Sequence, residues 1–188
     1  MANGTLKVSN IETSSGSGTI TLGASGETVD LSNGTITLNS TMKATPAFEA
    51  YMSANQTLSN NTLTKVNLNT ERFDTDSKYD TSAYRFTPGV AGKYFVYIVG
   101  RGGSSSNVDV RTVNFRLYLN GSTRIGFQQS SYNAYNLNYM NVTVNTIIDL
   151  NTTDYLETYC AIDVSGGTPT VTGGTEFTLF GAYRIIGA

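Results

Sequence analysis

The sequence contains no histidine and only one cysteine in 188 residues, and these absences exclude several kinds of site. Without histidine, neither a Ser-His-Asp triad nor a Cys-His pair can form, and zinc cannot be bound through imidazole. One cysteine cannot form an internal disulfide, so a secreted disulfide scaffold is excluded. Cys160 lies in the alternating apolar run YLETYCAI, which predicts a small buried core residue.

Phosphate-binding loops, a strong net charge and long apolar segments are missing as well. No GxxxxGK[ST] run occurs, and no GxGxxG follows a strand pattern into a helix. The net charge of −2 is too small to indicate nucleic acid or an anionic membrane as partner. No stretch approaches the roughly 20 apolar residues that span a bilayer, and the opening MANGTLKV lacks the apolar region of a signal peptide. We therefore expect no nucleic-acid partner, no membrane insertion and synthesis in a cytoplasm.

Catalytic and metal-binding patterns are weak. The acidic residues could supply a carboxylate pair for glycoside hydrolysis, but none stands out by its surroundings, so we expect no enzymatic activity and no cofactor. The densest acidic run, DTDSKYD over residues 74–80, has oxygen ligands at alternate positions as calcium requires, although Lys78 opposes a cation. The carboxylates of Asp74, Asp76 and Asp80 are weak calcium candidates, and the alternative is a solvated loop with Asx turns.

The residues that are abundant favour β-structure. Charged residues make up 14% of the chain, and its polarity comes instead from Asn, Thr, Ser and Gly, accompanied by 12 Tyr and 8 Phe. Small hydroxyl and amide side chains favour turns, and aromatic residues favour strands. No window carries a convincing apolar stripe of helical period, so we expect an all-β protein.

The first 45 residues form a repetitive segment that is poor in bulky side chains. The pentapeptide GTITL begins at Gly18 and again at Gly34, and no aromatic residue precedes Phe48. Apolar residues come in alternating pairs separated by Gly-rich and Ser-rich turns, which predicts short half-buried strands. Such a short segment rarely folds alone, so we interpret residues 1–45 as a slender β stem covered by neighbouring chains, most simply in a trimer. The alternative is a flexible linker.

From residue 46 to residue 188 aromatic residues are frequent, and we treat this part as a separate head domain. In GKYFVYIVG the side chains of Tyr94, Val96 and Ile98 share one face, and Asn120-Gly121 is a type I′ hairpin signal. Many short strands without helices predict a β-sandwich or jelly roll. The expected strands cover residues 47–52, 64–69, 84–86, 92–99, 112–119, 123–128, 138–149, 155–163 and 175–186.

The order of motifs in the head resembles the jelly-roll domain shared by the complement C-one-q globular domain and the tumour-necrosis-factor superfamily. The similar segments are PAFEA from Pro46, YRFTP from Tyr84 followed by GKYFVY, LYLNG from Leu117, DYLE from Asp154 and FTLFGAY from Phe177. Heads of that family trimerise around an apolar, aromatic axis, so the resemblance implies a homotrimer. The residues expected near the axis are Phe48, Tyr94, Phe180 and Tyr183.

The leading segment has a second resemblance. GTLKVSNI from Gly4, followed by SGSGTITLG from Ser15, is similar to the opening of fibre and decoration proteins of tailed bacteriophages, in which a short β stem carries a distal jelly-roll knob. This resemblance implies a location in the virion, with the stem contacting other virion proteins of the capsid, neck or tail.

A run of amides and tyrosines, QQSSYNAYN over residues 128–136, has a composition that is used to recognise sugars and proteins. Its candidates for receptor binding are Tyr132, Asn133, Tyr135 and Asn136, and the alternative is an ordinary exposed loop or a subunit contact.

These observations lead to one functional hypothesis and two alternatives. We expect a non-enzymatic, trimeric structural protein of a tailed-phage virion, whose jelly-roll knob supports particle stability or attachment to a host glycan or protein. The first alternative is a free-standing trimeric lectin or ligand-binding module of the complement or tumour-necrosis-factor type. The second, a glycan-cleaving tailspike, is disfavoured because a head of this size leaves little room for a long groove.

Overall fold

The computed structural model describes residues 42–106, 110–132 and 137–186, together with Gly26, Thr28, Thr35 and Thr37. The chain divides into two compact units, Met1–Thr37 and Leu38–Ala188. The predicted stem over residues 1–45 lies almost entirely outside the described residues, so its strands and its boundary stay predictions. The described part of the second unit is the jelly-roll head.

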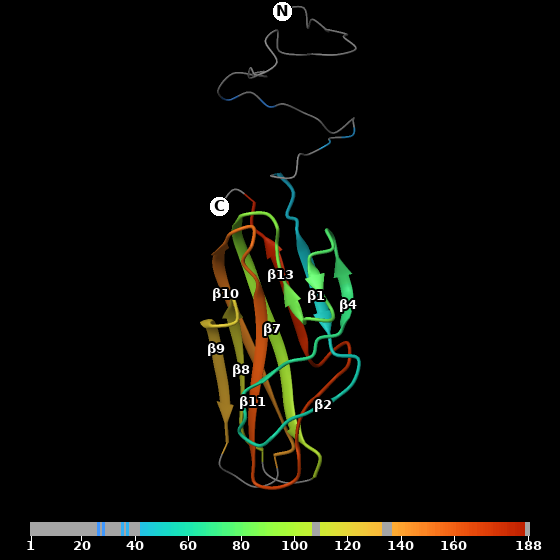
Figure 1. Ribbon diagram of the computed structural model, residues 1–188, viewed down its shortest axis with the longest axis vertical. Coiled ribbons are helices and arrows are strands. Elements are labelled where there is room, and N and C mark those ends of the chain that lie inside the picture. The colour runs from blue at the N-terminus through green and yellow to red at the C-terminus, as the bar shows by residue number, and fades with distance from the viewer. Residues whose placement is uncertain are drawn as a thin grey trace, which may run out of the picture. The chain divides into compact units, whose positions relative to one another are not determined.

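Two antiparallel sheets make up the head, and their longest strands run the length of it (Figure 1). The seven-stranded sheet contains β1 (Ala47–Tyr51), β2 (Gln56–Thr57), β4 (Thr70–Asp74), β7 (Gly92–Ser104), β10 (Tyr139–Leu150), β12 (Pro169–Val171) and β13 (Leu179–Arg184). The six-stranded sheet contains β3 (Thr64–Lys65), β5 (Tyr79–Asp80), β6 (Arg85–Phe86), β8 (Val110–Leu119), β9 (Thr123–Ser131) and β11 (Leu156–Val164).

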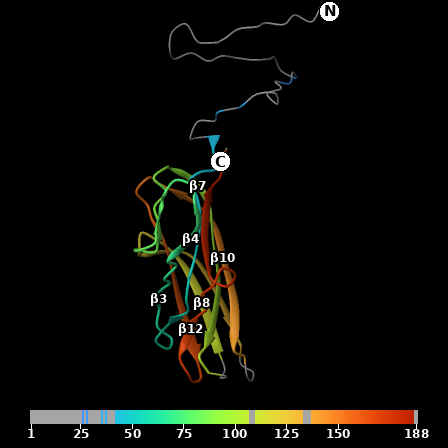
Figure 2. The same cartoon turned by 90° about the vertical axis from the view of Figure 1, so that its right-hand side faces the viewer.

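Strand order shows the crossovers of a jelly roll. One sheet runs β2-β12-β7-β13-β1-β4, and β10 pairs with β7; the other runs β5-β6-β11-β8-β9, and β3 pairs with β11. Because β10 and β13 pair with the same residues of β7, they lie on its two opposite edges. Figure 2 views the layers from the side, with β3 of the six-stranded sheet at the left and β10 of the seven-stranded sheet at the right.

The core lies between the sheets and follows the alternation in the sequence. Tyr94, Val96 and Ile98 of β7 are fully buried, as predicted, and face inward. From the other sheet, Phe115 packs so closely over Gly100 that a Cβ there would lie 2.2 Å from its ring, which explains the glycine in mid-strand. Cys160 is buried on β11, which confirms the prediction of a core thiol.

The hairpin between β8 and β9 confirms the Asn-Gly signal. Ser122 N–H donates to the Leu119 carbonyl at 3.3 Å, and the φ angles of Asn120 and Gly121 are 53° and 68°. Positive φ at both central residues defines the type I′ turn, whose twist matches that of the flanking strands.

Several strand predictions were wrong in extent. β7 runs five residues beyond the expected end at Val99, and the expected strand over residues 64–69 shortens to Thr64–Lys65. The expected final strand over residues 175–186 is confined to Leu179–Arg184. The short strands β2, β4, β5 and β12 were not expected. The described residues contain no α-helix, and accordingly none of them forms a helix able to cross a membrane.

Candidate functional site: an exposed aromatic sheet face

The outer face of the seven-stranded sheet carries large apolar side chains that the described part of the head covers only in part. Since side chains alternate along a strand, the inward series of β7 leaves Phe95, Tyr97 and Val99 on the outer face. Ile147 of β10 and Tyr183 of β13 join them and are 61% and 44% exposed. We call these five residues the assembly face. A contiguous apolar patch of this kind on a folded surface marks an interaction site.

The centre of the assembly face is a row across three strands. Phe95 pairs in register with Ile147 on one side and with Tyr183 on the other. The ring of Phe95 lies 5.4 Å from that of Tyr183 and 6.0 Å from that of Tyr97, measured between centroids. The rings therefore form one continuous aromatic surface, and Ile147 extends it onto β10.

Tyr97 connects this surface to a partly buried carboxylate. Its hydroxyl donates to Glu49 Oε2 at 2.5 Å, and Arg72 donates to Glu49 Oε1. Burial and the hydrogen bond to Glu49 raise the pKa of Tyr97 well above its usual value, so the phenol stays protonated and keeps donating. Gly181 lies beneath the ring, where a Cβ would come within 2.4 Å of Tyr97 Cζ. Glu49 is thus neutralised within the chain, and the surface above it is uncharged.

Charged groups lie at the two ends of the assembly face. Lys93 Nζ and Asp149 Oδ1 are 3.5 Å apart at one end, beyond the row of Phe95. At the other end the guanidinium of Arg101 is stacked between two rings, 4.1 Å from the centroid of Tyr139 and 4.8 Å from that of Phe177. An apolar centre with a polar rim is the anatomy of a protein–protein interface.

Three of the four residues expected near a threefold axis lie elsewhere. Phe48, Tyr94 and Phe180 are buried in the core of the single chain. Phe48 stacks on Tyr79 and Phe86 of the opposite sheet at centroid distances of 4.8 Å and 4.5 Å. Because these rings are covered by their own chain, they cannot line a surface between chains. Only Tyr183 reaches the outer face, and its place near an axis stays a prediction.

The receptor-binding candidates are only partly described. Tyr132 is exposed directly after β9, where its backbone N–H donates to the Arg111 carbonyl at 2.9 Å. Asn133, Tyr135 and Asn136 lie outside the described residues. The beginning of the expected loop is strand, since β9 continues to Ser131 and pairs with β8.

The three calcium candidates lie in one loop region, where Asp74 and Asp80 accept hydrogen bonds from the chain itself. Asp74 Oδ2 accepts the Tyr79 N–H at 2.7 Å, and Asp80 Oδ1 accepts the Ser82 hydroxyl at 2.6 Å. The hydrogen bonds from Ser82 and Ala83 hold the pKa of Asp80 below its usual value. These carboxylates therefore fix turns. In the described part of the chain, no three acidic, histidine or cysteine side chains gather as metal ligands.

The buried thiol is chemically unreactive in this position. Burial raises the pKa of Cys160 far above its usual value, so the thiolate that would act as nucleophile or metal ligand does not form near neutral pH. This arrangement supports a structural role for Cys160 in the core of the head.

The assembly face was not predicted, although the sequence contains a signal for it. In GKYFVYIVG both alternating series are apolar, so the strand has two faces to cover and one sandwich core covers only one of them. Glu49, Arg72 and Ile147 had no comparable signal, because their proximity to this surface depends on the register of β1, β4 and β10.

Comparisons with known proteins identify the fold. No protein-family model matches the chain, and neither does any curated protein sequence. Among solved structures, the globular domain of zebrafish complement 1qA has a TM-score of 0.54 at 14% identity and is matched over 74% of this chain and 96% of its own. Murine APRIL has a TM-score of 0.53 at 10% identity and is matched over 74% of this chain and 98% of its own. The head is therefore an all-β jelly roll of the complement and tumour-necrosis-factor type.

Proposed function

We propose that the protein is a non-enzymatic module that assembles as a homotrimer through the assembly face. The carrying observation is the partly exposed row of Ile147, Phe95 and Tyr183 across three strands, beside a carboxylate, Glu49, that is neutralised by Tyr97 and Arg72. A second copy of the chain is the occupant that supplies an equal apolar surface. Closed rotational symmetry would bury the same patch on every chain.

The predicted stem and the fold both favour an assembly of three chains. Threefold symmetry would bring three stems together, which would cover the alternating apolar pairs of residues 1–45. The fold likeness to complement and tumour-necrosis-factor domains supports the same arrangement. A trimer would also triple any weak affinity of the head for a surface, by avidity.

The setting that we propose is the virion of a tailed phage. The supporting feature is the N-terminal sequence pattern, a short repetitive β segment ahead of a jelly-roll head. In this setting the stem would bind capsid, neck or tail proteins, and the head would project as a fibre or decoration knob toward a host glycan or protein. A free-standing trimeric lectin or ligand-binding module is the second candidate, and the likeness of the head to complement and tumour-necrosis-factor domains favours it.

Light scattering on the full-length protein tests the assembly. Three chains of 20.2 kDa should elute as one species over a wide concentration range. A species with the mass of one chain at micromolar concentration would refute the trimer.

A truncation and particle labelling test the setting. Deletion of residues 1–45 should leave a folded head that no longer incorporates into particles. Antibody to the head should label intact particles if the virion assignment is right, and normal incorporation of the truncated protein would refute the role of the stem.

A further inference from the structure

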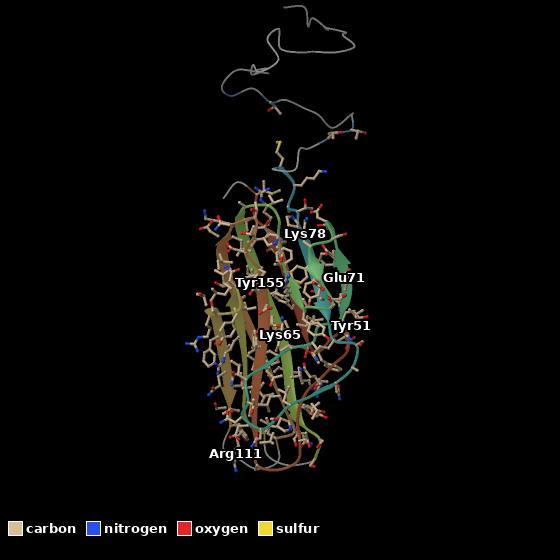
Figure 3. All side chains as sticks on the ribbon, in the orientation of Figure 1. Tyr51, Lys65, Glu71, Lys78, Arg111 and Tyr155 are labelled. Carbon is tan, nitrogen blue, oxygen red and sulfur yellow. The ribbon has the colours of Figure 1, made fainter. Side chains whose placement is uncertain are left out.

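The six-stranded sheet has its own outer face, on the side of the sandwich away from the assembly face. In β8, inward Phe115 and Leu117 alternate with Arg116 and Tyr118 on the outer side of the sheet, where the preceding Asn114 is itself buried. Figure 3 labels Tyr155, Lys65 and Arg111, which follow one another down the length of this sheet. The outward side chains of this sheet combine aromatic rings with arginines.

An exposed phenylalanine lies beside two guanidinium groups. Phe127 of β9 is 44% exposed and pairs in register with Arg116. The Cζ atom of Arg116 lies 5.5 Å from the ring centroid of Phe127, and that of Arg124 lies 5.2 Å from it. Arg116 Nε also donates to Asn114 Oδ1 at 3.1 Å, which fixes the direction of its guanidinium. The two cations and the ring form one cluster.

Two tyrosines continue the platform next to this unit. The rings of Tyr118 and Tyr159 meet edge to face at a centroid distance of 5.0 Å, and Tyr159 pairs in register with Arg116. We call Arg116, Tyr118, Arg124, Phe127 and Tyr159 the arginine–aromatic face.

The arginines of this face have no acidic partner among the described residues. The adjacent carboxylate, Glu157, is taken by Lys65 Nζ at 2.5 Å and by the Tyr159 hydroxyl at 3.2 Å. Further along β11, Asp163 Oδ2 lies 3.8 Å from Arg111 Nη1. Arg116 and Arg124 therefore keep their positive charge uncompensated, in a protein whose net charge is −2. A guanidinium stacked on a ring leaves its N–H edge free for a carboxylate or sulfate.

We propose that the arginine–aromatic face binds an acidic carbohydrate. Sugar rings would stack on Phe127 and Tyr118 through their C–H faces, and the carboxylate or sulfate groups of the sugar would pair with Arg116 and Arg124. The exposed amide of Gln129, which lies beside Asn114 in register, would bond to hydroxyls. Two uncompensated cations are too few for nucleic acid, whose binding depends on many phosphate contacts. An acidic polypeptide segment is the competing occupant, but a sheet face with an exposed phenylalanine ring and two half-buried tyrosine rings suits pyranose rings better than a peptide.

This inference does not depend on the trimer or on the virion. All five residues belong to one chain and one sheet, so a single chain carries a complete site. In a trimer assembled through the opposite face, three such sites would point outward.

The test is a titration of the full-length protein with hexameric probes by calorimetry. Hexagalacturonate and a sulfated carrageenan hexamer carry the expected anionic groups, maltohexaose is the neutral comparison, and hexaglutamate is the acidic peptide. We expect at least one acidic sugar to bind at least tenfold more tightly than maltohexaose or hexaglutamate. Failure of both acidic sugars to bind, or equally tight binding of hexaglutamate, would overturn the proposal.

Matched variants separate a specific site from a general effect of charge. Arg124→Gln and Phe127→Ala should each weaken binding of the acidic sugar at least fivefold. Arg111→Gln removes the same charge from the same sheet but from an arginine beside Asp163, and should change affinity less than twofold. If Arg111→Gln weakens binding as much as Arg124→Gln does, the attraction is non-specific and the proposal fails. A melting curve of each variant shows that it is folded, and the elution mass reports separately on the trimer.

Discussion

Replacing Ile147 by aspartate perturbs the assembly face at the residue that one chain covers least. Complete burial of an isoleucine side chain contributes about 1.5–3 kcal/mol. Since 61% of Ile147 is exposed in the single chain, its burial between chains would add about 0.9–1.8 kcal/mol per chain, or about 3–5 kcal/mol per trimer. An aspartate loses this contribution and brings an unpaired charge into the interface, which costs several further kcal/mol. At about 1.4 kcal/mol per factor of ten, trimer formation should weaken at least 100-fold.

Light scattering over a dilution series, with a melting curve at each concentration, measures this effect. Ile147→Asp should elute with the mass of one chain at concentrations where the wild-type protein has the mass of three. The matched control is Thr123→Asp, which places the same charge at an exposed strand position of the other sheet and should leave the mass unchanged. Retention of the full mass by Ile147→Asp would remove β10 from the interface and refute the assembly face as defined here.

Two further predictions concern the packing beneath and between the sheets. Gly181→Ala should lower the free energy of unfolding by about 2–4 kcal/mol, because the new Cβ displaces the Tyr97 ring and its bond to Glu49. The same change in a Tyr97→Ala background should cost less than about 1 kcal/mol in a denaturant titration, and equal costs in both backgrounds would contradict the proposed contact. Cys160 should react with iodoacetamide only as fast as the head unfolds; rapid labelling of the native protein would show that the thiol is accessible.

The alternation of apolar residues was enough to predict which residues of the long strands face the core. Tyr94, Val96 and Ile98 lie inside because a period of two repeats over a strand long enough to be recognised. The short strands had no such pattern. β4, with the sequence TERFD, is polar and mostly exposed, and it is a strand because β1 pairs with it. Its position could not be predicted from local preference, since the paired residues of β1 and β4 lie about twenty residues or more apart in the sequence, from 19 for Tyr51 and Thr70 to 26 for Phe48 and Asp74.

The burial of Phe48 and Phe180 within a single chain was unpredictable for a different reason. Their assignment to a subunit axis followed from a resemblance in sequence motifs, and a motif locates a strand without showing which of its faces is covered. The contacts that bury Phe48, with Tyr79 and Phe86, join two sheets and separate parts of the chain. Such contacts depend on the completed sandwich. The outward series that begins at Phe95 was visible in the same run, but its role depends on the finding that no described element forms a third layer above β7.

The two outer faces of the sandwich differ in the way their charges are satisfied, and this difference determines what each can bind. On the assembly face the one partly buried carboxylate, Glu49, is neutralised by Tyr97 and Arg72, so an apolar partner can cover it without stranding a charge. On the arginine–aromatic face the carboxylate Glu157 is paired with Lys65, while Arg116 and Arg124 have no acidic partner among the described residues. An apolar partner would remove these two guanidinium groups from water without replacing the lost hydration, which costs free energy. We therefore expect self-association through one sheet and binding of an anionic ligand on the other. Because the two surfaces share no residue, a trimer would present three ligand sites together, and a site of only millimolar affinity could still hold a multivalent sugar surface.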